Sequence, residues 1–192
     1  MKEKLISFVA IFIILSFTAC SLAGNTKTVV EKTNDIYVCI PCGSSCDTIL
    51  SDKPGTCPHC HMELVKKSTI VHGNVLPEEL CSYIFSNGNE NIILLDVRTP
   101  EEFNGTAPDK FGRLKDAINI PVQDLQTRIK ELDGYKEKEI IVYCSHSHWS
   151  PRASYMLTQN GFKHVTNMSG GMSAWKEKVK DAACNKMIFV TQ

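Results

Sequence analysis

The chain has 192 residues, of which 43% are hydrophobic and 22% charged, values typical of a globular protein with one sizeable core. Its 21 basic and 21 acidic residues cancel, and no block of Lys or Arg gathers along the sequence. This pattern excludes an extended phosphate-binding surface, so we expect no nucleic-acid partner. Five of the nine cysteines lie between residues 39 and 60, which indicates separate roles rather than one disulfide framework.

The N-terminus has the pattern of an export signal. Two lysines precede an apolar run over residues 5–15, and the small residues Thr18-Ala19 lead into Cys20. The run is short for a bilayer span. Small residues before a cysteine resemble the lipobox of bacterial lipoproteins, which implies a signal peptide over residues 1–19, acylation of Cys20, and a membrane-anchored protein on the periplasmic or extracellular side. An uncleaved anchor or an ordinary signal peptide is the alternative, and either one also exports the protein.

A polar tether over residues 20–35 precedes a cysteine-rich module over residues 36–67. The module contains two CxxC pairs separated by 14 residues, and two such pairs can place four thiolates around zinc or another thiophilic divalent ion. Cys46 is left as a spare thiol, and two disulfides are the alternative in an oxidising compartment. The predicted metal ligands are Cys39, Cys42, Cys57 and Cys60.

This module also resembles the heavy-metal-binding domain found beside metal efflux components. The Met-His pair of that family is absent, because Pro41-Cys42-Gly43 stands in its region, and His61 replaces a glycine. These departures favour an all-thiolate site over a thioether copper site. The matching residues are Tyr37, Cys39, Pro54-Gly55, Cys57-Pro58, Cys60, Met62 and Leu64.

Residues 70–180 show alternating helix and strand patterns, followed by a C-terminal tail over residues 181–192. Such alternation predicts an α/β fold with a mainly parallel sheet flanked by helices. Helices are predicted over residues 77–85, 122–132, 150–160 and 173–179, and strands over residues 91–97, 139–144 and 165–168.

Cys144 stands at the carboxyl end of a predicted central strand and just before a helix. Open α/β sheets bind their ligands at this edge, and backbone N–H groups there stabilise an anionic sulfur. A structural cysteine would more often lie inside the strand. The position therefore favours a reactive thiol.

A second resemblance covers about 110 residues and is carried by motifs that occur in order. The chain is similar to the rhodanese-like sulfurtransferases, which implies transfer of a sulfane sulfur through a persulfide on Cys144. Asp96 and Arg98 match that family's Asp-x-Arg, either in a substrate role or as a fold-stabilising charge pair. The matching segments are Leu95-Asp96-Val97-Arg98-Thr99-Pro100-Glu101-Glu102-Phe103, Gly112, Ala117-Ile118-Asn119-Ile120-Pro121, Val142-Tyr143-Cys144, Gly161-Phe162, Gly170-Gly171-Met172 and Trp175.

The predicted substrate loop departs from the family pattern. Ser147 stands where a glycine is common and Trp149 stands at the arginine position, so Arg152 is the candidate for the missing positive charge. Phosphatase and arsenate reductase relatives need an arginine where this chain has Ser150, which disfavours those activities. The loop residues are Ser145, His146, Ser147, His148 and Trp149.

Two functions follow from these patterns. The first is an exported, lipid-anchored sulfurtransferase or persulfide carrier, whose partners are a sulfane-sulfur donor and a thiol acceptor and which needs no cofactor for the transfer. The second is a non-catalytic metal-binding or redox-sensing lipoprotein on a degenerate fold of the same family. Trp149 favours the second function and the placement of Cys144 favours the first.

Overall fold

A computed structural model describes residues 35–87, 91–179 and 183–191. The signal peptide predicted over residues 1–19, the lipidation site Cys20 and nearly all of the predicted tether lie outside these ranges. From residue 34 onward the chain forms one compact unit. Within the described ranges, no helix is both long enough and apolar enough to cross a membrane.

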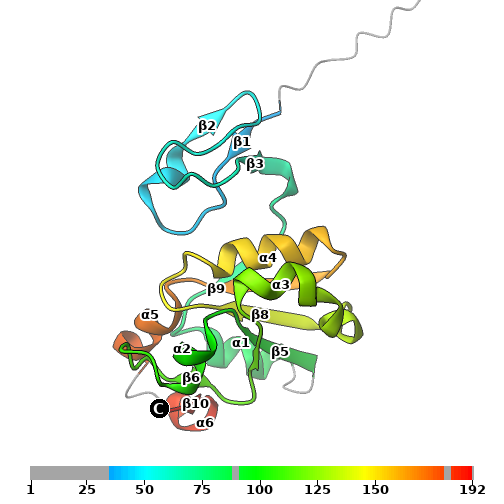
Figure 1. The fold of residues 1–192 in the computed structure, drawn as a ribbon. Helices are drawn as coiled ribbons and strands as arrows, with labels where there is room; N and C mark the ends of the chain where they lie inside the picture. The colour runs from blue at the N-terminus through cyan, green and yellow to red at the C-terminus, as the bar shows by residue number, and fades with distance from the viewer. Residues whose placement is uncertain (1–34, 88–90, 180–182, 192) are drawn as a thin grey trace, which may run out of the picture. The chain divides into compact units, whose positions relative to one another are not determined.

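The cysteine module is built on a small antiparallel sheet (Figure 1). Its strand order is β2-β1-β3, with β1 at Tyr37–Val38, β2 at Leu50–Ser51 and β3 at Val65–Lys66. A short 3-10 helix, η1 at Ser45–Thr48, follows β1. The buried cluster of this module consists of Cys39, Cys46, Cys57 and Leu64, and Val38 and Ile40 are buried as well. Three of the four residues in the cluster are cysteines, so the module has only a small hydrocarbon core.

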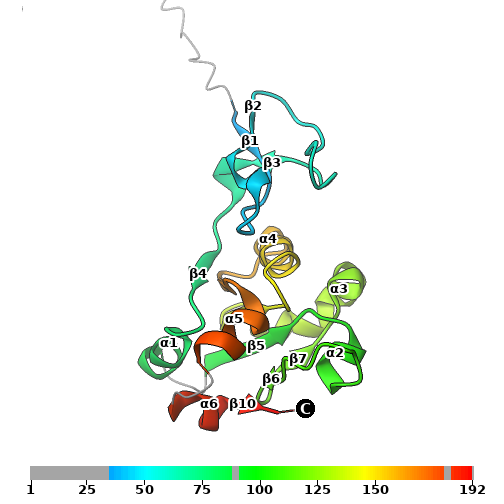
Figure 2. The same ribbon diagram turned by 90° about the vertical axis from the view of Figure 1, so that its left-hand side faces the viewer.

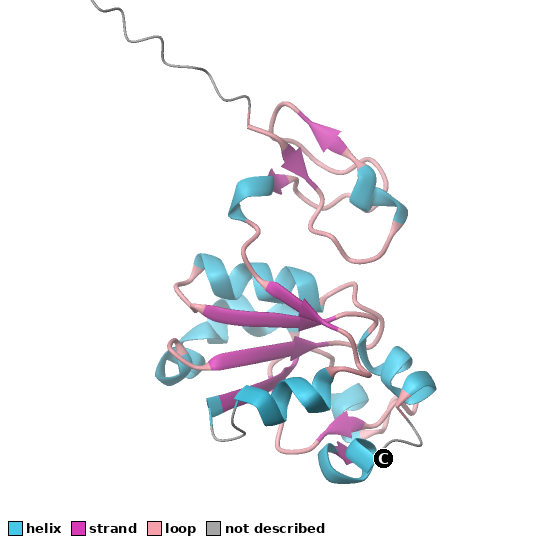
Figure 3. Ribbon diagram, turned by 180° about the vertical axis from the view of Figure 1, so that it is seen from behind, coloured by secondary structure: helices cyan, strands magenta, loops and turns pink. Residues whose placement is uncertain are grey.

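A five-stranded parallel sheet forms the centre of the larger domain, with the order β4-β9-β8-β5-β7 (Figure 3). This confirms the predicted mainly parallel α/β fold. β8 and β5 stand in the middle of the order and are covered on both faces, which is why their sequences are nearly continuous apolar runs. The strands are β4 at Gly73–Val75, β5 at Ile92–Asp96, β7 at Ile118–Asn119, β8 at Glu139–Tyr143 and β9 at His164–Met168.

Helices cover the two faces of this sheet (Figures 1 and 2). One face packs against α3 at Val122–Arg128 and α4 at Ser150–Gln159. The opposite face packs against α1 at Leu80–Asn87 and α5 at Gly171–Lys178. The helix expected over residues 122–132 ends earlier as an α-helix and continues as the 3-10 helix η4 at Ile129–Tyr135.

Alternation along β8 decides which face carries Cys144. Ile140, Val142 and Cys144 lie in the core beneath α3 and α4, whereas Ile141 and Tyr143 lie in the core beneath α1 and α5. Because side chains of a strand alternate with period two, the register of β8 places the Cys144 side chain on the α3 and α4 face.

The segment expected to be a C-terminal tail contains α6 at Ala183–Ile188 and β10 at Phe189–Val190. β10 pairs antiparallel with β6 at Arg113–Leu114. Gly112, with φ +73°, makes this contact possible, because a Cβ atom there would lie 2.1 Å from the Phe189 ring and 2.8 Å from the Val190 carbonyl oxygen. Two-residue strands have too little periodicity for a sequence pattern to reveal them.

Candidate functional site

Cys144 follows directly after β8 and is 1% exposed. Its Sγ lies 3.4 Å from the Oγ of Ser150, which is the first residue of α4. The thiol is therefore enclosed between the end of a central strand and the beginning of a helix, at the edge of the sheet where the sequence predicted it.

The backbone of the loop is fixed by α5. The Met172 N–H donates to the Cys144 carbonyl at 2.8 Å, and the Ser173 N–H donates to the Ser145 carbonyl at 2.9 Å. Gly171 has φ +63°, and a Cβ atom there would lie 2.4 Å from the Cys144 carbonyl oxygen. Only glycine permits this close approach, which explains the Gly170-Gly171 pair in the sequence.

Ser147 adopts a left-handed conformation with φ +64°, which is unfavourable for a residue with a side chain. Its hydroxyl offsets this cost. The Ser147 Oγ accepts the Gly170 N–H at 2.5 Å and lies 3.4 Å from the Met168 carbonyl, to which it donates. This position, commonly glycine in the family that the chain resembles, thus keeps the glycine backbone conformation here. Its side chain adds one hydrogen bond to the end of β9 and one to Gly170 just before α5.

We predict that Ser147→Ala lowers the free energy of unfolding by about 1 to 3 kcal/mol, because the partly buried Gly170 N–H loses its acceptor while the unfavourable φ remains. Ser147→Gly loses the same bonds but removes about 1 kcal/mol of backbone strain, so it should be less destabilising. Urea denaturation of the three proteins measures this order. Equal losses for the two variants would contradict the role of the left-handed backbone.

The predicted pair Asp96 and Arg98 forms a buried ion pair, with the two residues 0% and 2% exposed. The Arg98 Nη2 lies 2.6 Å from the Asp96 Oδ2 and also donates to the Gly112 carbonyl at 2.9 Å. Burial disfavours the guanidinium charge, but the hydrogen bonds and charge of Asp96 outweigh it and raise the pKa of Arg98. Asp96 thus fixes the guanidinium of Arg98, which also lines a cavity beside the loop.

That cavity, of about 540 Å³, is lined in part by Arg98, Glu102, Ser145, His146 and Trp149. Glu102 was not singled out by the sequence patterns. It accepts the Ser145 hydroxyl at 2.5 Å through Oε1, while its Oε2 accepts the Thr99 N–H at 3.1 Å as part of a capping box at α2, Pro100–Asn104. The Glu102 carboxylate thus both caps α2 and holds Ser145 of the loop.

The side chains of His146, His148 and Trp149 differ in what they contact. Trp149 is 46% exposed and lines the cavity, as does His148. The His146 ring makes an edge contact with Phe111 at a centroid distance of 5.2 Å. Arg152, the candidate replacement for the missing charge, lies on the exposed side of α4 and lines a different cavity together with Trp149. The structure therefore does not bring Arg152 to the cavity beside Ser145 and His146.

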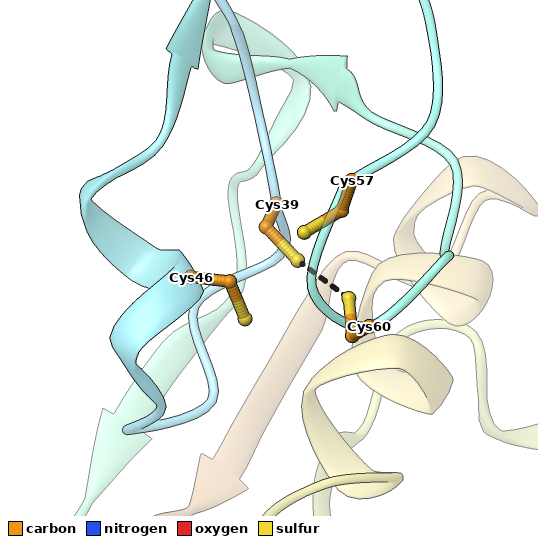
Figure 4. Close-up of side chains that lie close together, drawn as sticks. All are labelled: Cys39, Cys46, Cys57 and Cys60. Carbon is orange, nitrogen blue, oxygen red and sulfur yellow. Dashed lines mark hydrogen bonds between the residues drawn. The ribbon is translucent and has the colours of Figure 1, made fainter.

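Four sulfur atoms converge in the cysteine module (Figure 4). The Sγ atoms all lie within 4.8 Å of one another, and those of Cys39 and Cys60 are 3.4 Å apart. A tetrahedral zinc site with Zn–S bonds of about 2.3 Å has sulfur atoms roughly 3.8 Å apart, so this donor set fits such an ion. The converging residues are Cys39, Cys46, Cys57 and Cys60, and all four carry free thiols.

This group differs from the predicted set, because Cys46 takes the place of Cys42. The helix η1 carries Cys46 into the module core, where it is 3% exposed. Cys42 lies in a turn. The Cys42 N–H and the Gly43 N–H both donate to the Asp47 carboxylate, at 2.7–3.1 Å. The CxxC spacing favoured Cys42 as a metal ligand. The 3-10 helix η1, which brings Cys46 into the four-sulfur group, has no strong sequence signal.

The thiols of this cluster have unequal acidities. The backbone N–H of Cys60 hydrogen-bonds the Cys57 sulfur and lowers the pKa of Cys57 to about 7. Burial raises the pKa of Cys46 to about 11, and burial together with hydrogen bonds from neighbouring thiols raises the pKa of Cys39. Because several of these groups hold their protons, a cation that binds all four must displace them, so binding should strengthen as pH rises.

Comparison with known proteins identifies the larger domain. Residues 83–178 match the Rhodanese-like domain family. The chain belongs to this family. A Bacillus subtilis protein, YqhL, is 35% identical over 96 residues, which cover 50% of this chain and 70% of that protein. A putative mitochondrial thiosulfate sulfurtransferase of Schizosaccharomyces pombe is 31% identical over 48% of this chain and 69% of its own length. A sulfurtransferase of Allochromatium vinosum is 31% identical over 45% of this chain and 73% of its own length.

The rhodanese-like domain thus supplies the enzymatic part of the chain, and these relatives support sulfur transfer as its general activity. The matched residues include Cys144 and the whole loop, whereas the cysteine module lies before them. The sequence patterns singled out Cys144 and its loop but gave no role at the site to Glu102 or to the Ser150 hydroxyl. The capping box Thr99-x-x-Glu102 was the available signal for Glu102, and the position of Ser150 at the N-terminus of a helix was the signal for that hydroxyl.

Proposed function

We propose that this chain accepts a sulfane sulfur on Cys144 and passes it to a thiol. The observation that carries the proposal is the enclosure of Cys144 at the end of β8, with its carbonyl and that of Ser145 bound by α5 N–H groups. The Cys144 thiolate attacks the outer sulfur of the donor, and the bond between that sulfur and the rest of the donor breaks. With thiosulfate, sulfite leaves. An acceptor thiolate then attacks the outer sulfur of the persulfide, and Cys144 leaves as a thiolate.

We expect the protein treated with a small-thiol persulfide or thiosulfate to gain the mass of one sulfur atom on Cys144. Cys144→Ser should abolish this gain and the transfer to an acceptor thiol, because a serine hydroxyl cannot form a persulfide. Intact-mass and peptide mass spectrometry after alkylation provide the measurement. A sulfur gain that is equally large in Cys144→Ser would remove Cys144 from the reaction.

We also propose that the cysteine module binds one divalent ion, preferably zinc, through Cys39, Cys46, Cys57 and Cys60. The four sulfurs are close enough to share an ion. The module has little apolar core of its own, so metal binding would supply much of its folding free energy. The sulfur transfer itself needs no metal.

Export and lipid anchoring are part of the proposed function. Their support is the leader pattern before Cys20, together with the disulfide formed by Cys81, since disulfides persist mainly in oxidising compartments. The lipid would hold the domain on the periplasmic or extracellular side of the membrane.

Cys20→Ser is expected to move the mature protein from the detergent-extracted membrane fraction to the soluble fraction, because the acylated thiol is lost. Ser21→Ala, the matched control, should leave the protein with the membrane. Fractionation and lipid mass analysis provide the readouts. Membrane association that persists in Cys20→Ser, with no lipid mass in the unmodified protein, would argue for an uncleaved anchor instead.

A second candidate function is metal binding or redox sensing without efficient catalysis. The exposed Trp149 favours it, because this position lacks the charge that an arginine would offer to an anionic donor. A protein that never acquires a persulfide on Cys144, yet binds metal through its cysteine module, would have this function.

A further inference from the structure

Cys42 is the thiol of the cysteine module that the metal site leaves unused. The Cys42 Sγ lies within 4.8 Å of the Cys46 Sγ and of an Asp47 carboxylate oxygen, but it does not belong to the four-sulfur group. Unlike the buried Cys39, Cys46 and Cys57, it is partly exposed. The hydrogen bonds to Asp47 hold the turn that carries it.

Two cavities are lined both by Cys42 and by residues of the loop that follows Cys144 in the rhodanese-like domain. Cys42 lines the cavity of about 540 Å³ together with Ser145 and His146, and it lines a second cavity of about 510 Å³ together with His146 and Ser147. The two domains are also joined near the connecting segment, where the Thr69 hydroxyl lies 3.1 Å from the Tyr155 hydroxyl. Cys42 therefore lies beside the residues that immediately follow Cys144.

An independent feature of the first cavity indicates an anionic sulfur ligand. Arg98, which lines this cavity, is 2% exposed, and its Nη1 has no hydrogen-bond partner among the described residues although Nε and Nη2 are bound. A buried N–H of a charged group without an acceptor costs free energy. A persulfide or thiolate anion in the cavity would supply that acceptor and the compensating charge.

We propose that Cys42 is the intramolecular acceptor of the sulfur carried by Cys144. This inference rests on the proposed function, and it names the acceptor thiol. The Cys42 thiolate attacks the outer sulfur of the Cys144 persulfide, a new S–S bond forms at Cys42, and the S–S bond to Cys144 breaks. Cys144 leaves as a thiolate, so sulfur atoms and electrons balance without an added oxidant or reductant.

The burial of Cys144 decides which sulfur is attacked. Its Sγ is 1% exposed, so the inner sulfur of a persulfide is shielded, whereas the outer sulfur extends further from the protein backbone. Attack on the inner sulfur would give a Cys42–Cys144 disulfide and release hydrosulfide. The geometry favours the first course, which leaves Cys144 ready to accept another sulfur and leaves a persulfide on the partly exposed Cys42 for onward delivery.

A single-turnover experiment on the full, metal-loaded chain tests this transfer. The protein is charged with one equivalent of a small-thiol persulfide, quenched with an alkylating agent at intervals, and analysed by peptide mass spectrometry. Sulfur should occur first on Cys144 and then on Cys42, at a rate independent of protein concentration. In Cys42→Ser the Cys144 persulfide should persist at least about tenfold longer, because an intramolecular thiol has an effective concentration in the millimolar range.

Two control variants accompany this test. Ser45→Ala changes the wall of the same cavity without removing a thiol and should transfer sulfur like the unmodified protein. Cys144→Ser should leave Cys42 without sulfur, since Cys42 is charged only through Cys144. Metal content, measured in each variant, checks that the module is folded.

Three outcomes would overturn the inference while leaving the proposed function intact. They are a charged Cys144 with no later sulfur on Cys42, a transfer rate that rises in proportion to protein concentration, and a Cys42–Cys144 disulfide formed with release of hydrosulfide. Failure to charge Cys144 at all would instead overturn the proposed function, and the inference with it.

Discussion

Replacement of Cys46 by serine is expected to abolish stable metal binding by the cysteine module. Cys46 is 3% exposed and its sulfur belongs to the four-sulfur group, so the variant loses one of the four proposed ligands. Changes in the outer shell of a metal site already cost roughly ten- to a hundredfold in affinity, and loss of a ligand should cost more than about a hundredfold. Metal analysis after gel filtration, and competition with a chelator, measure the loss.

Cys42→Ser is the matched control for this prediction, because it removes a neighbouring thiol that lies outside the four-sulfur group. We expect it to retain one equivalent of metal. The reverse result, with metal lost in Cys42→Ser and kept in Cys46→Ser, would restore the ligand set that the CxxC spacing suggests. Two disulfides and no metal in the unmodified protein would exclude the site altogether.

Trp149→Arg is expected to raise the thiosulfate sulfurtransferase rate about ten- to a hundredfold. An arginine at this position would place a guanidinium in the cavity that Ser145 and His146 line, whereas the indole offers one N–H and no charge. One well-aimed charged hydrogen bond contributes about 1.5 to 3 kcal/mol, which corresponds to that range of rates if it acts in the transition state. Steady-state assays with thiosulfate and cyanide measure the change.

Three further variants separate charge from other effects. Trp149→Gln removes the ring without adding charge and should not raise the rate. Arg152→Ala should leave the rate unchanged, because Arg152 lines a different cavity. Cys144→Ser should abolish turnover in every background. If the unmodified protein used thiosulfate as fast as Trp149→Arg, the buried Arg98 or the loop N–H groups would already supply the positive potential, and our account of Trp149 would be wrong.

The placement of Cys144 at the end of a central strand could be predicted from sequence, because its signals are local and strong. An apolar run that ends at Cys144, followed by a helix with Pro151 in its first turn, specifies a strand, a loop and a helix from neighbouring residues alone. Period-two alternation within β8 then determines which side chains share a face. The same local character made the helix ahead of Asn160 and the parallel strand pattern predictable.

The cysteines that converge in the module were harder to predict, because their convergence depends on a fold with few local signals. A CxxC pair is visible in sequence, but the choice between Cys42 and Cys46 depends on the helix η1 and on the turn that Asp47 holds. Both features are only a few residues long, and neither has a hydrophobic period. Spacing alone therefore identified three of the four clustered sulfurs and missed the fourth.

From its sequence alone, this protein could be assigned an α/β domain, a thiol at the end of its central strand and a separate cysteine module, because each follows from periodicity or spacing within a short segment. The rhodanese type of the domain was implied by the resemblance of its motifs to that family. Only the tertiary structure decided which cysteines converge, that Asp96 binds Arg98 while the Arg98 Nη1 has no hydrogen-bond partner among the described residues, and that Cys42 lies beside the loop after Cys144. These relations join residues that are distant in sequence, and chain packing alone brings such residues together.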